Sequence, residues 1–316
     1  NCTACPAGKL SEHLNSTDCD ACPKGGYCAA TGAASERQTS EPCPAGTFNP
    51  DPGQSSNASC QACEAGKASP IPGSDVQAVC KECLPGSVAV NNGSAACALC
   101  PAGTEQPHGS MRNCSRCGLG VYCPPGSSNA LSCPAGRFGN ESGLGAEDEC
   151  HACPIGHFCS TGAEQPSRCS PGTVAPQSKM TACDGCRAGT YQDGLGQTAC
   201  KLCKAGSFCG NASAAPLPCP AGRWTNRTDV QRGDGCEGCP EGHSCGVGVS
   251  EATPCGAGTF ANASGLSECF RCAAGKLQSE EGKTACLDCP PASYCDDGAS
   301  VALPCLAGTF SNATGL

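Results

Sequence analysis

The sequence has few of the residues that build an apolar core. Leu, Ile, Val and Phe together account for 35 of the 316 residues, which is about 11 %. A chain with less than roughly 20 % of these residues does not bury enough apolar surface to offset the entropy of folding. Aromatic residues make up only 4 % of the chain. A single large domain held by one hydrophobic core is therefore excluded.

Long apolar runs and an excess of positive charge are also missing. No run of about 18 apolar residues occurs, so we expect no membrane span in this segment. The formal net charge is −9 at pH 7. Because nucleic-acid binding needs a basic surface, we expect no nucleic-acid partner. The five histidines are scattered, and none lies near both a candidate nucleophile and an orienting acid. We therefore expect no enzyme.

Cysteine is instead abundant, at 36 of 316 residues. This share is typical of a disulfide scaffold, in which cross-links replace the missing core. Each bridge that closes a loop of roughly 15 residues is worth about 3 kcal/mol. Disulfides persist in oxidising compartments. Zinc binding would need thiolates in a reducing compartment, and redox chemistry needs one poised pair rather than twelve C-x-x-C pairs. No metal and no dissociable cofactor are expected.

Asparagine is concentrated in glycan acceptor sequences. Of 13 asparagines, 10 lie in N-x-S/T, whereas about 2 would be expected by chance. We therefore expect an extracellular protein, secreted or at the cell surface, that carries covalent N-glycans. The predicted acceptors are Asn1, Asn15, Asn57, Asn92, Asn113, Asn140, Asn211, Asn226, Asn262 and Asn312.

The cysteines follow a strict period over most of the chain. Cys100, Cys186 and Cys272 are 86 residues apart, and every other cysteine from Cys100 onward that has a counterpart keeps the same step. We therefore divide the chain into irregular cysteine-rich modules at 1–99, super-repeats at 100–185 and 186–271, and a truncated third super-repeat at 272–316. A fixed period predicts an array in which each unit contacts its neighbours.

The predicted fold is a set of small disulfide-rich modules, with short β-hairpins, turns and almost no helix, stacked as an elongated rod. Eleven of the 12 aromatic residues occupy two recurring positions, so we expect each ring to pack over the nearest disulfide. A glycine follows many module cysteines by three residues, where a tight turn needs positive φ. These glycines are Gly103, Gly136, Gly189, Gly222, Gly258, Gly275 and Gly308.

Loop closure predicts the bridges of the short units. A bridge inside a C-x-x-C pair would close almost no loop, so the second Cys of one pair should join the first Cys of the next. The predicted bridges are Cys5–Cys19, Cys63–Cys80, Cys83–Cys97, Cys100–Cys114, Cys186–Cys200 and Cys272–Cys286. The longer units hold four cysteines each, and three connectivities are possible for them.

The motifs "CPAGTF" at Cys43, "CPAGRF" at Cys133 and "CKAGSFC" at Cys203 carry a family resemblance. They resemble ephrin-receptor-like cysteine-rich repeats, which are related to the cysteine-rich modules of tumour-necrosis-factor receptors and to C-x-x-C-rich surface proteins of protists. The resemblance covers essentially the whole chain and is specific for the module. Such modules occur in receptors, coats and adhesins, and similar arrays build glycan-coated extracellular fibrils.

The resemblance to tumour-necrosis-factor-receptor modules implies a crossed connectivity in the long units. A sequential connectivity, with Cys117–Cys123 and Cys133–Cys150, remains the alternative, and the sequence does not decide between them. The implied crossed bridges are Cys117–Cys133, Cys123–Cys150, Cys203–Cys219 and Cys209–Cys236.

The regular acceptors favour a structural function. Asn140, Asn226 and Asn312 keep the 86-residue step, as a glycan coat along a filament would require. We expect an extracellular structural glycoprotein that self-associates into a surface filament, sheath or coat, with other surface glycoproteins as possible partners. The alternative is the ectodomain stalk or ligand-binding array of a cell-surface receptor or adhesin.

Overall fold

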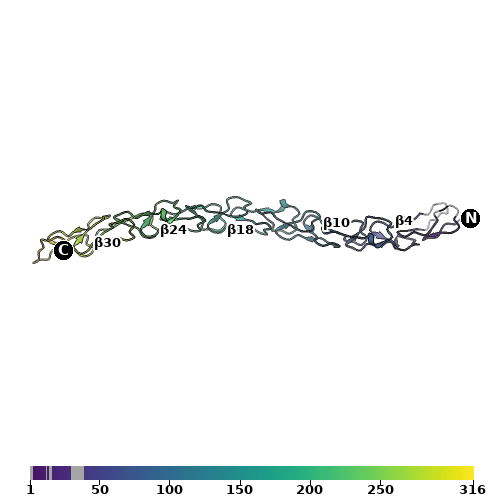
Figure 1. Cartoon of the computed structure of the whole chain (residues 1–316), viewed down its shortest axis with the longest axis horizontal. Helices are drawn as coiled ribbons and strands as arrows, with labels where there is room; N and C mark the ends of the chain where they lie inside the picture. Colours follow the sequence, from purple (N-terminus) through teal and green to yellow (C-terminus); the bar gives the residue numbers. More distant parts are fainter. Residues whose placement is uncertain (1–2, 12, 14–15, 30–38) are drawn as a thin grey trace. The chain divides into compact units, whose positions relative to one another are not determined.

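The computed structural model describes residues 3–11, 13, 16–29 and 39–316. The predicted acceptors Asn1 and Asn15 lie outside the described residues. The chain divides into two compact units, Asn1–Ala152 with Cys159–Gln165, and Cys153–Phe158 with Pro166–Leu316. In both units the chain consists of short strands joined by turns (Figure 1).

The described residues form 17 two-stranded antiparallel sheets, each made of two consecutive strands of two residues. The strands of the first unit are β1 (Lys9–Leu10), β2 (Asp20–Ala21), β3 (Gly26–Tyr27), β4 (Glu41–Pro42), β5 (Thr47–Phe48), β6 (Gln61–Ala62), β7 (Lys67–Ala68), β8 (Lys81–Glu82), β9 (Ser87–Val88), β10 (Ala98–Leu99), β11 (Thr104–Glu105), β12 (Ser115–Arg116), β13 (Val121–Tyr122), β14 (Leu131–Ser132), β15 (Arg137–Phe138) and β16 (His151–Ala152). The strands of the second unit are β17 (His157–Phe158), β18 (Ser167–Arg168), β19 (Thr173–Val174), β20 (Asp184–Gly185), β21 (Thr190–Tyr191), β22 (Lys201–Leu202), β23 (Ser207–Phe208), β24 (Leu217–Pro218), β25 (Arg223–Trp224), β26 (Glu237–Gly238), β27 (His243–Ser244), β28 (Thr253–Pro254), β29 (Thr259–Phe260), β30 (Phe270–Arg271), β31 (Lys276–Leu277), β32 (Leu287–Asp288), β33 (Ser293–Tyr294) and β34 (Leu303–Pro304).

Helical structure in the described residues is limited to four 3-10 turns. These are η1 (Asn57–Ser59), η2 (Gln77–Val79), η3 (Glu147–Glu149) and η4 (Gly233–Gly235). The predicted class, small disulfide-rich modules of hairpins with almost no helix, is confirmed.

Each of the 17 hairpins belongs to one module. We name each module after its first cysteine, which is buried in all of them except the Cys5 module. In the Cys100 module, a turn through Gly103 leads into β11, and β12 returns to the next module. Thr104 N donates to Pro101 O at 3.1 Å across this turn, and Gly103 has a φ of +79°. A positive φ at the third turn position is the geometry that glycine adopts without strain. All seven glycines predicted to need it have positive φ.

Loop length separates the modules that carry a 3-10 turn from those that do not. Four bridges span 17 residues, and in each of them a 3-10 turn ends just before the second cysteine. The bridges that span 14 residues have no such turn among the described residues. The three extra residues of the longer loop therefore form one turn of 3-10 helix without changing the hairpin.

The bridges of the short units are those that loop closure predicts. The structure forms Cys5–Cys19, Cys63–Cys80, Cys83–Cys97, Cys100–Cys114, Cys186–Cys200 and Cys272–Cys286. At Cys43–Cys60, Cys169–Cys183 and Cys255–Cys269, a single cysteine joins the first Cys of the next C-x-x-C pair.

The crossed connectivity of the long units is wrong. Neither Cys117–Cys133 with Cys123–Cys150, nor Cys203–Cys219 with Cys209–Cys236, is formed. The structure has the sequential bridges Cys117–Cys123, Cys133–Cys150, Cys203–Cys209 and Cys219–Cys236.

The sequential bridges form because a module has a buried position six residues after its first cysteine. Gln106 holds this position in one module, and its backbone oxygen accepts a hydrogen bond from Gly86 N. Cys123 holds it in the next module, six residues after Cys117, and its oxygen accepts from Gly103 N. A cysteine at this position lies beside the first cysteine of its own module and bonds to it. The predicted long unit is therefore two modules with one bridge each.

Backbone hydrogen bonds join each module to the next. In one example Cys63 N donates to Gly46 O, Gly46 N donates to Ser69 O, and Gly73 N donates to Cys43 O, each at 2.8 Å. Equivalent bonds recur at most steps of both units. We call the contacts that a module makes with the one or two modules before it a seam. Because every seam reuses backbone groups, its formation depends on turn geometry more than on side chains.

Glycines bring modules that are two steps apart into direct contact. A Cβ atom added at Gly46 would lie 2.1 Å from Gly93 O, and one added at Gly206 would lie 2.2 Å from Gly248 O. No side chain fits at such distances from backbone. The module glycines are therefore required both for their turns and for the packing of the next module but one.

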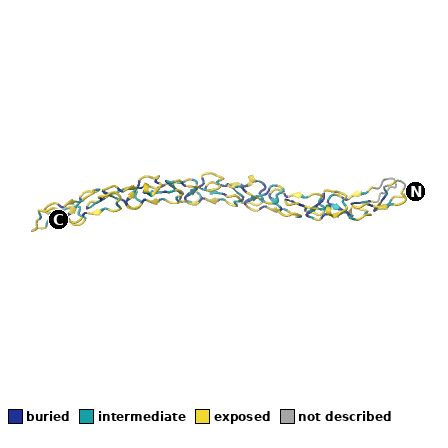
Figure 2. Cartoon of the chain, viewed as in Figure 1, coloured by how far each residue is buried: buried dark blue, intermediate teal, exposed yellow. Residues whose placement is uncertain are grey.

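The interior of each unit is thin and consists largely of half-cystines. Figure 2 shows buried stretches that are short and distributed along the chain. Tyr191 packs against Cys203 and Cys209, which belong to the following module, and Phe208 packs on the cluster of Cys219 and Cys236. The expected ring-on-disulfide packing is present in these clusters, but the ring covers the bridge of the next module. The aromatic residue thus strengthens a seam as well as its own hairpin.

The elements repeat at the period of the sequence. β13, β23 and β33 begin at residues 121, 207 and 293, which are 86 apart. One period contains five modules, beginning in the first super-repeat at Cys100, Cys117, Cys133, Cys153 and Cys169. The predicted super-repeat boundaries describe this period, and their status as domain boundaries remains a prediction.

Candidate functional site: acceptor asparagines and module seams

The described acceptor asparagines are all exposed. Each lies on a different module, so the fold distributes them and does not gather them into one cluster. They are Asn57, Asn92, Asn113, Asn140, Asn211, Asn226, Asn262 and Asn312. Exposure is the condition that a carrier of a bulky glycan must meet.

The module fold explains the exposure of the regularly spaced acceptors. Asn226 directly follows Thr225, which is 1 % exposed, and Asn262 directly follows Ala261, which is fully buried. Both buried residues occupy the position six residues after the first cysteine of their modules. Where the chain leaves that buried position it turns toward solvent, so the next residue is presented at the surface.

Two acceptors also bind the preceding module. Asn92 Oδ1 accepts a hydrogen bond from Ala65 N at 2.8 Å, and Asn211 Oδ1 accepts one from Ala188 N at 3.0 Å. Sequence reasoning did not find this role. Both asparagines immediately precede a residue with positive φ, Gly93 and Ala212. The sequence signals such a turn only at Asn92, through the Asn-Gly pair.

Buried glutamines form a second class of residue that sequence reasoning missed. Gln192 is 2 % exposed, its Nε2 donates to Ala199 O at 2.6 Å, and its Oε1 accepts from Gly194 N at 3.0 Å. Gln106 and Gln278 make equivalent bonds one period before and after. The amide therefore ties the two ends of the loop together, and its recurrence every 86 residues was visible in the sequence.

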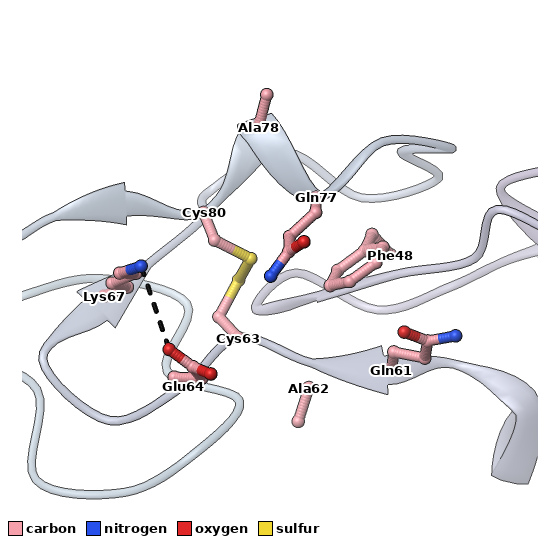
Figure 3. Close-up of a pocket in the computed structure, with 9 residues that line it drawn as sticks. All are labelled: Phe48, Gln61, Ala62, Cys63, Glu64, Lys67, Gln77, Ala78 and Cys80. Atoms are coloured by element: carbon pink, nitrogen blue, oxygen red, sulfur yellow. Dashed lines mark ion pairs between the residues drawn. A yellow bond between two sulfur atoms is a disulfide. The ribbon is translucent and has the colours of Figure 1, made fainter.

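A polar pocket of about 430 Å³ lies beside the Cys63–Cys80 bridge (Figure 3). In this view the Gln77 amide points into the space between the bridge and the Phe48 ring. The Glu64 carboxylate and the Lys67 ammonium lie 3.8 Å apart and pair with each other. The lining residues are Phe48, Gln61, Ala62, Cys63, Glu64, Lys67, Gln77, Ala78 and Cys80. They present no nucleophile with an adjacent base.

Ion pairs on the surface are local. Arg227 binds Asp229 through two hydrogen bonds of 3.0 Å, and these bonds lower the pKa of the Asp229 carboxyl. Lys201 Nζ lies 2.5 Å from Asp193 Oδ1, and this hydrogen bond lowers the pKa of Asp193 in the same way. Both pairs are well exposed to solvent, where such pairs add little to stability.

His157 and His243 lie 86 residues apart and make equivalent contacts with backbone. His157 Nδ1 lies 3.0 Å from Ile155 O, and His243 Nδ1 lies 3.0 Å from Glu241 O. Within the described residues no group of three or more His, Cys, Asp or Glu side chains has an arrangement that would hold a metal ion. The described chain also contains no helix with the length and apolar character of a membrane span.

Residues 258–302 match the family model described as tyrosine-protein kinase ephrin type A/B receptor-like. No curated protein matches the chain. The matched segment includes the whole Cys272 module. The preceding Cys255 module has the same hairpin and a bridge of the same span, and the following Cys289 module has the same hairpin with a bridge that spans 6 residues. The disulfide-bonded repeats indicate an extracellular protein. The described chain is therefore an array of disulfide-bonded cysteine-rich repeats, of which residues 258–302 are similar to the ephrin-receptor-like kind.

Proposed function

We propose that the chain is a structural extracellular glycoprotein, whose modules stack as a stiff rod and whose rods assemble into a surface filament, sheath or coat. In this proposal the protein is not an enzyme and needs no cofactor beyond its covalent glycans. Its main partner is a second copy of the same chain, and other surface glycoproteins are further candidates.

The observation that carries the proposal is the regular seam. Equivalent hydrogen bonds and close glycine contacts recur along each unit, and they reach both the next module and the next but one. Contacts of this reach resist bending between modules, because a bend must open two sets of contacts at once. Arrays whose repeats contact their neighbours form extended scaffolds rather than enclosed sites.

The positions of the acceptor asparagines favour a glycan coat. Eight exposed asparagines on eight modules would cover the array with glycans at intervals of a few modules. Three of them, Asn140, Asn226 and Asn312, keep the 86-residue step and would present glycans at matching intervals. Equivalent surfaces at a regular step allow heterologous contacts, which propagate into open filaments unless a rotation closes them.

A second candidate is the ectodomain stalk or ligand-binding array of a cell-surface receptor or adhesin. The observation that favours it is the description of the matched family, which names a receptor. A stalk needs the same stacked modules but no contact between copies. The two functions therefore differ in one property, which is self-association.

The test is microscopy and light scattering of the purified, glycosylated protein over a range of concentrations. The structural proposal predicts filaments or a mass that rises with concentration. A strictly monomeric protein at high concentration, with and without divalent cations, would contradict it and favour the stalk.

A further inference from the structure

Asn92 and Asn211 differ from the other described acceptors in how their amides are held. Asn92 Oδ1 accepts from Ala65 N at 2.8 Å and Asn211 Oδ1 accepts from Ala188 N at 3.0 Å, in each case across a seam. The side-chain amides of the remaining described acceptors make no hydrogen bond to the described protein. Those acceptors are Asn57, Asn113, Asn140, Asn226, Asn262 and Asn312.

The hydrogen bond fixes which amide atom faces the preceding module. A backbone N–H can only donate, so the atom that meets Ala65 N must be the carbonyl oxygen of the Asn92 side chain. The nitrogen Nδ2 leaves the same planar group at about 120° from that oxygen and is directed away from Ala65. N-glycans are attached through Nδ2. The bond across the seam and a glycan on the same asparagine are therefore compatible.

The local sequence also restrains the turn around each of these asparagines. Ser94 Oγ donates to Asn91 O at 2.8 Å, and Gly93 N donates to Cys63 O at 2.8 Å. At the second site Ser213 Oγ donates to Gly210 O at 3.0 Å. The hydroxyl residue of each acceptor sequence thus holds the turn that carries the asparagine.

We propose that Asn92 and Asn211 are anchored glycosylation sites, at which the amide bond to the preceding module holds the glycan in one orientation over the seam. This inference rests on the proposed glycoprotein function and divides its acceptors into two classes. Glycans on the other acceptors rotate about side chains that no neighbour restrains. At the two anchored sites the glycan is part of the contact between modules.

Proline provides a substitution that removes only the donor. Ala65 occupies the second position of the turn from Glu64 to Lys67, in which Lys67 N donates to Glu64 O at 3.0 Å. Gly66 holds the third position with a φ of +90°. Proline is favoured at the second position of such a turn and lacks the N–H. The chain already has proline at the equivalent position of three other modules, Pro85, Pro171 and Pro291. Ala65→Pro and Ala188→Pro therefore preserve the turn, delete one hydrogen bond each and displace the asparagine amide from that bonding position.

The experiment measures release of glycans from the folded, secreted protein by peptide-N-glycosidase, resolved by site with mass spectrometry. In the unchanged protein we expect release at Asn92 and Asn211 to be about fivefold slower than at Asn140 and Asn226, the factor that corresponds to one net hydrogen bond of about 1 kcal/mol. Ala65→Pro should raise the rate at Asn92 and leave Asn211 unchanged. Ala188→Pro should do the reverse, so each variant is the control for the other.

The outcomes separate this inference from the proposed function. Equal release rates at all occupied sites, or rates at Asn92 and Asn211 that the proline variants do not change, would overturn the anchored class and leave the glycosylated array intact. Anchored sites that carry no glycan, while other acceptors are occupied, would overturn it as well. Absence of glycan at every acceptor would overturn both the inference and the glycan coat.

Discussion

Two equivalent seams, one period apart, differ in the residue at one turn position and in the contacts that this turn makes. In the first, Gly143 N donates to Cys117 O at 2.9 Å, and a Cβ added at Gly103 would lie 2.3 Å from Gly143 O. We call this the Gly143 seam. It has the full set of contacts that recurs along the array, including the positive φ of +77° at Gly143.

The second seam has aspartate in place of that glycine. Asp229 does not adopt a positive φ, and among the described residues Asp229 N has no bond to Cys203 O. A Cβ added at Gly189 would lie 2.9 Å from Asp229 O, which is a looser contact than at the Gly143 seam. We call this the Asp229 seam. The Arg227 side chain donates two hydrogen bonds to the Asp229 carboxylate on the solvent-exposed side of this turn.

The difference shows what the seam depends on. Positive φ costs an ordinary residue roughly 1–2 kcal/mol. Ser110, Lys179 and Ala212 adopt it at the equivalent position and keep the hydrogen bond. Asp229, whose carboxylate binds Arg227, takes another backbone conformation and loses the bond. The bridges and hairpins on both sides are unchanged, since Cys203–Cys209 and Cys219–Cys236 match Cys117–Cys123 and Cys133–Cys150. The bridges therefore set the modules, and positive φ at the turn residue sets how tightly the modules stack.

The largest expected effect tests whether the disulfide bridges set the modules. Replacing Cys133 and Cys150 by alanine opens a loop of 17 residues and should cost about 3 kcal/mol of unfolding free energy, whereas replacing Cys117 and Cys123 opens a loop of 6 residues and should cost about 2 kcal/mol. Denaturant unfolding with fragment-resolved mass spectrometry measures both. Secretion of a Cys123→Ala, Cys150→Ala variant with an intact fold would contradict the sequential bridges, because it leaves two unpaired cysteines in neighbouring modules.

The next effect tests the glycine contact and uses the two seams as a matched pair. Gly103→Ala drives a methyl group against Gly143 O and should cost about 2 kcal/mol, from overpacking and strained φ together. In Gly189→Ala the added methyl group faces the looser Asp229 seam, so this variant should cost about 1 kcal/mol less than Gly103→Ala. Limited proteolysis of the folded protein, with cleavage sites located by mass spectrometry, reports the opening of each seam. Equal proteolysis of the two variants would mean that the close approach does not limit the stack.

A smaller effect is expected from a substitution that restores the missing hydrogen bond of the Asp229 seam. Asp229→Gly permits positive φ and should recover the hydrogen bond to Cys203 O, which raises the local opening free energy at residue 229 by about 1 kcal/mol. NMR exchange of that amide measures the change. Gly143→Asp is the matched control and should lower protection at residue 143 by a similar factor. If Asp229→Gly leaves the amide as exposed as before, the turn residue is not the cause of the difference.

The smallest effect is the pH dependence of the Asp229 seam. The hydrogen bond from Arg227 lowers the pKa of Asp229 in the folded state. The stabilisation of the seam by the Arg227–Asp229 pair is therefore present at pH values above the pKa of an aspartate in the unfolded chain. It is lost as the pH falls through the pKa of Asp229 in the folded protein. Acidification should increase amide exchange around Asp229 and leave the Gly143 seam unchanged. A parallel increase at both seams would assign the acid effect to other groups.

The sequence predicts the module better than the contacts within it. Loop closure gives the bridge from Cys100 to Cys114 because only that pairing closes a loop of useful length. The positive φ at Gly103 follows from its place in a tight turn. Cys123 is different, because its partner is decided by a buried position that only the folded hairpin creates. A resemblance to related modules then supplied the wrong connectivity.

The contacts at the seams could not be predicted from the residues alone. Gln192 and Asn211 use side chains to bind backbone groups, and the partners are fixed by the register of loops and neighbouring modules. The sequence shows only that glutamine recurs at one position and that Asn211 precedes a turn residue. Their exposure differs as well, since Gln192 is buried and Asn211 is exposed.

Site-resolved hydrogen exchange of the folded, disulfide-intact protein tests the stacked array most directly. The account predicts slow exchange at the module glycine amides that bond across seams, such as Gly46, Gly103 and Gly206, and fast exchange at Asp229. Exchange at the glycine amides as fast as at Asp229 would contradict it, because the modules would then be linked only by the chain and not by their seams.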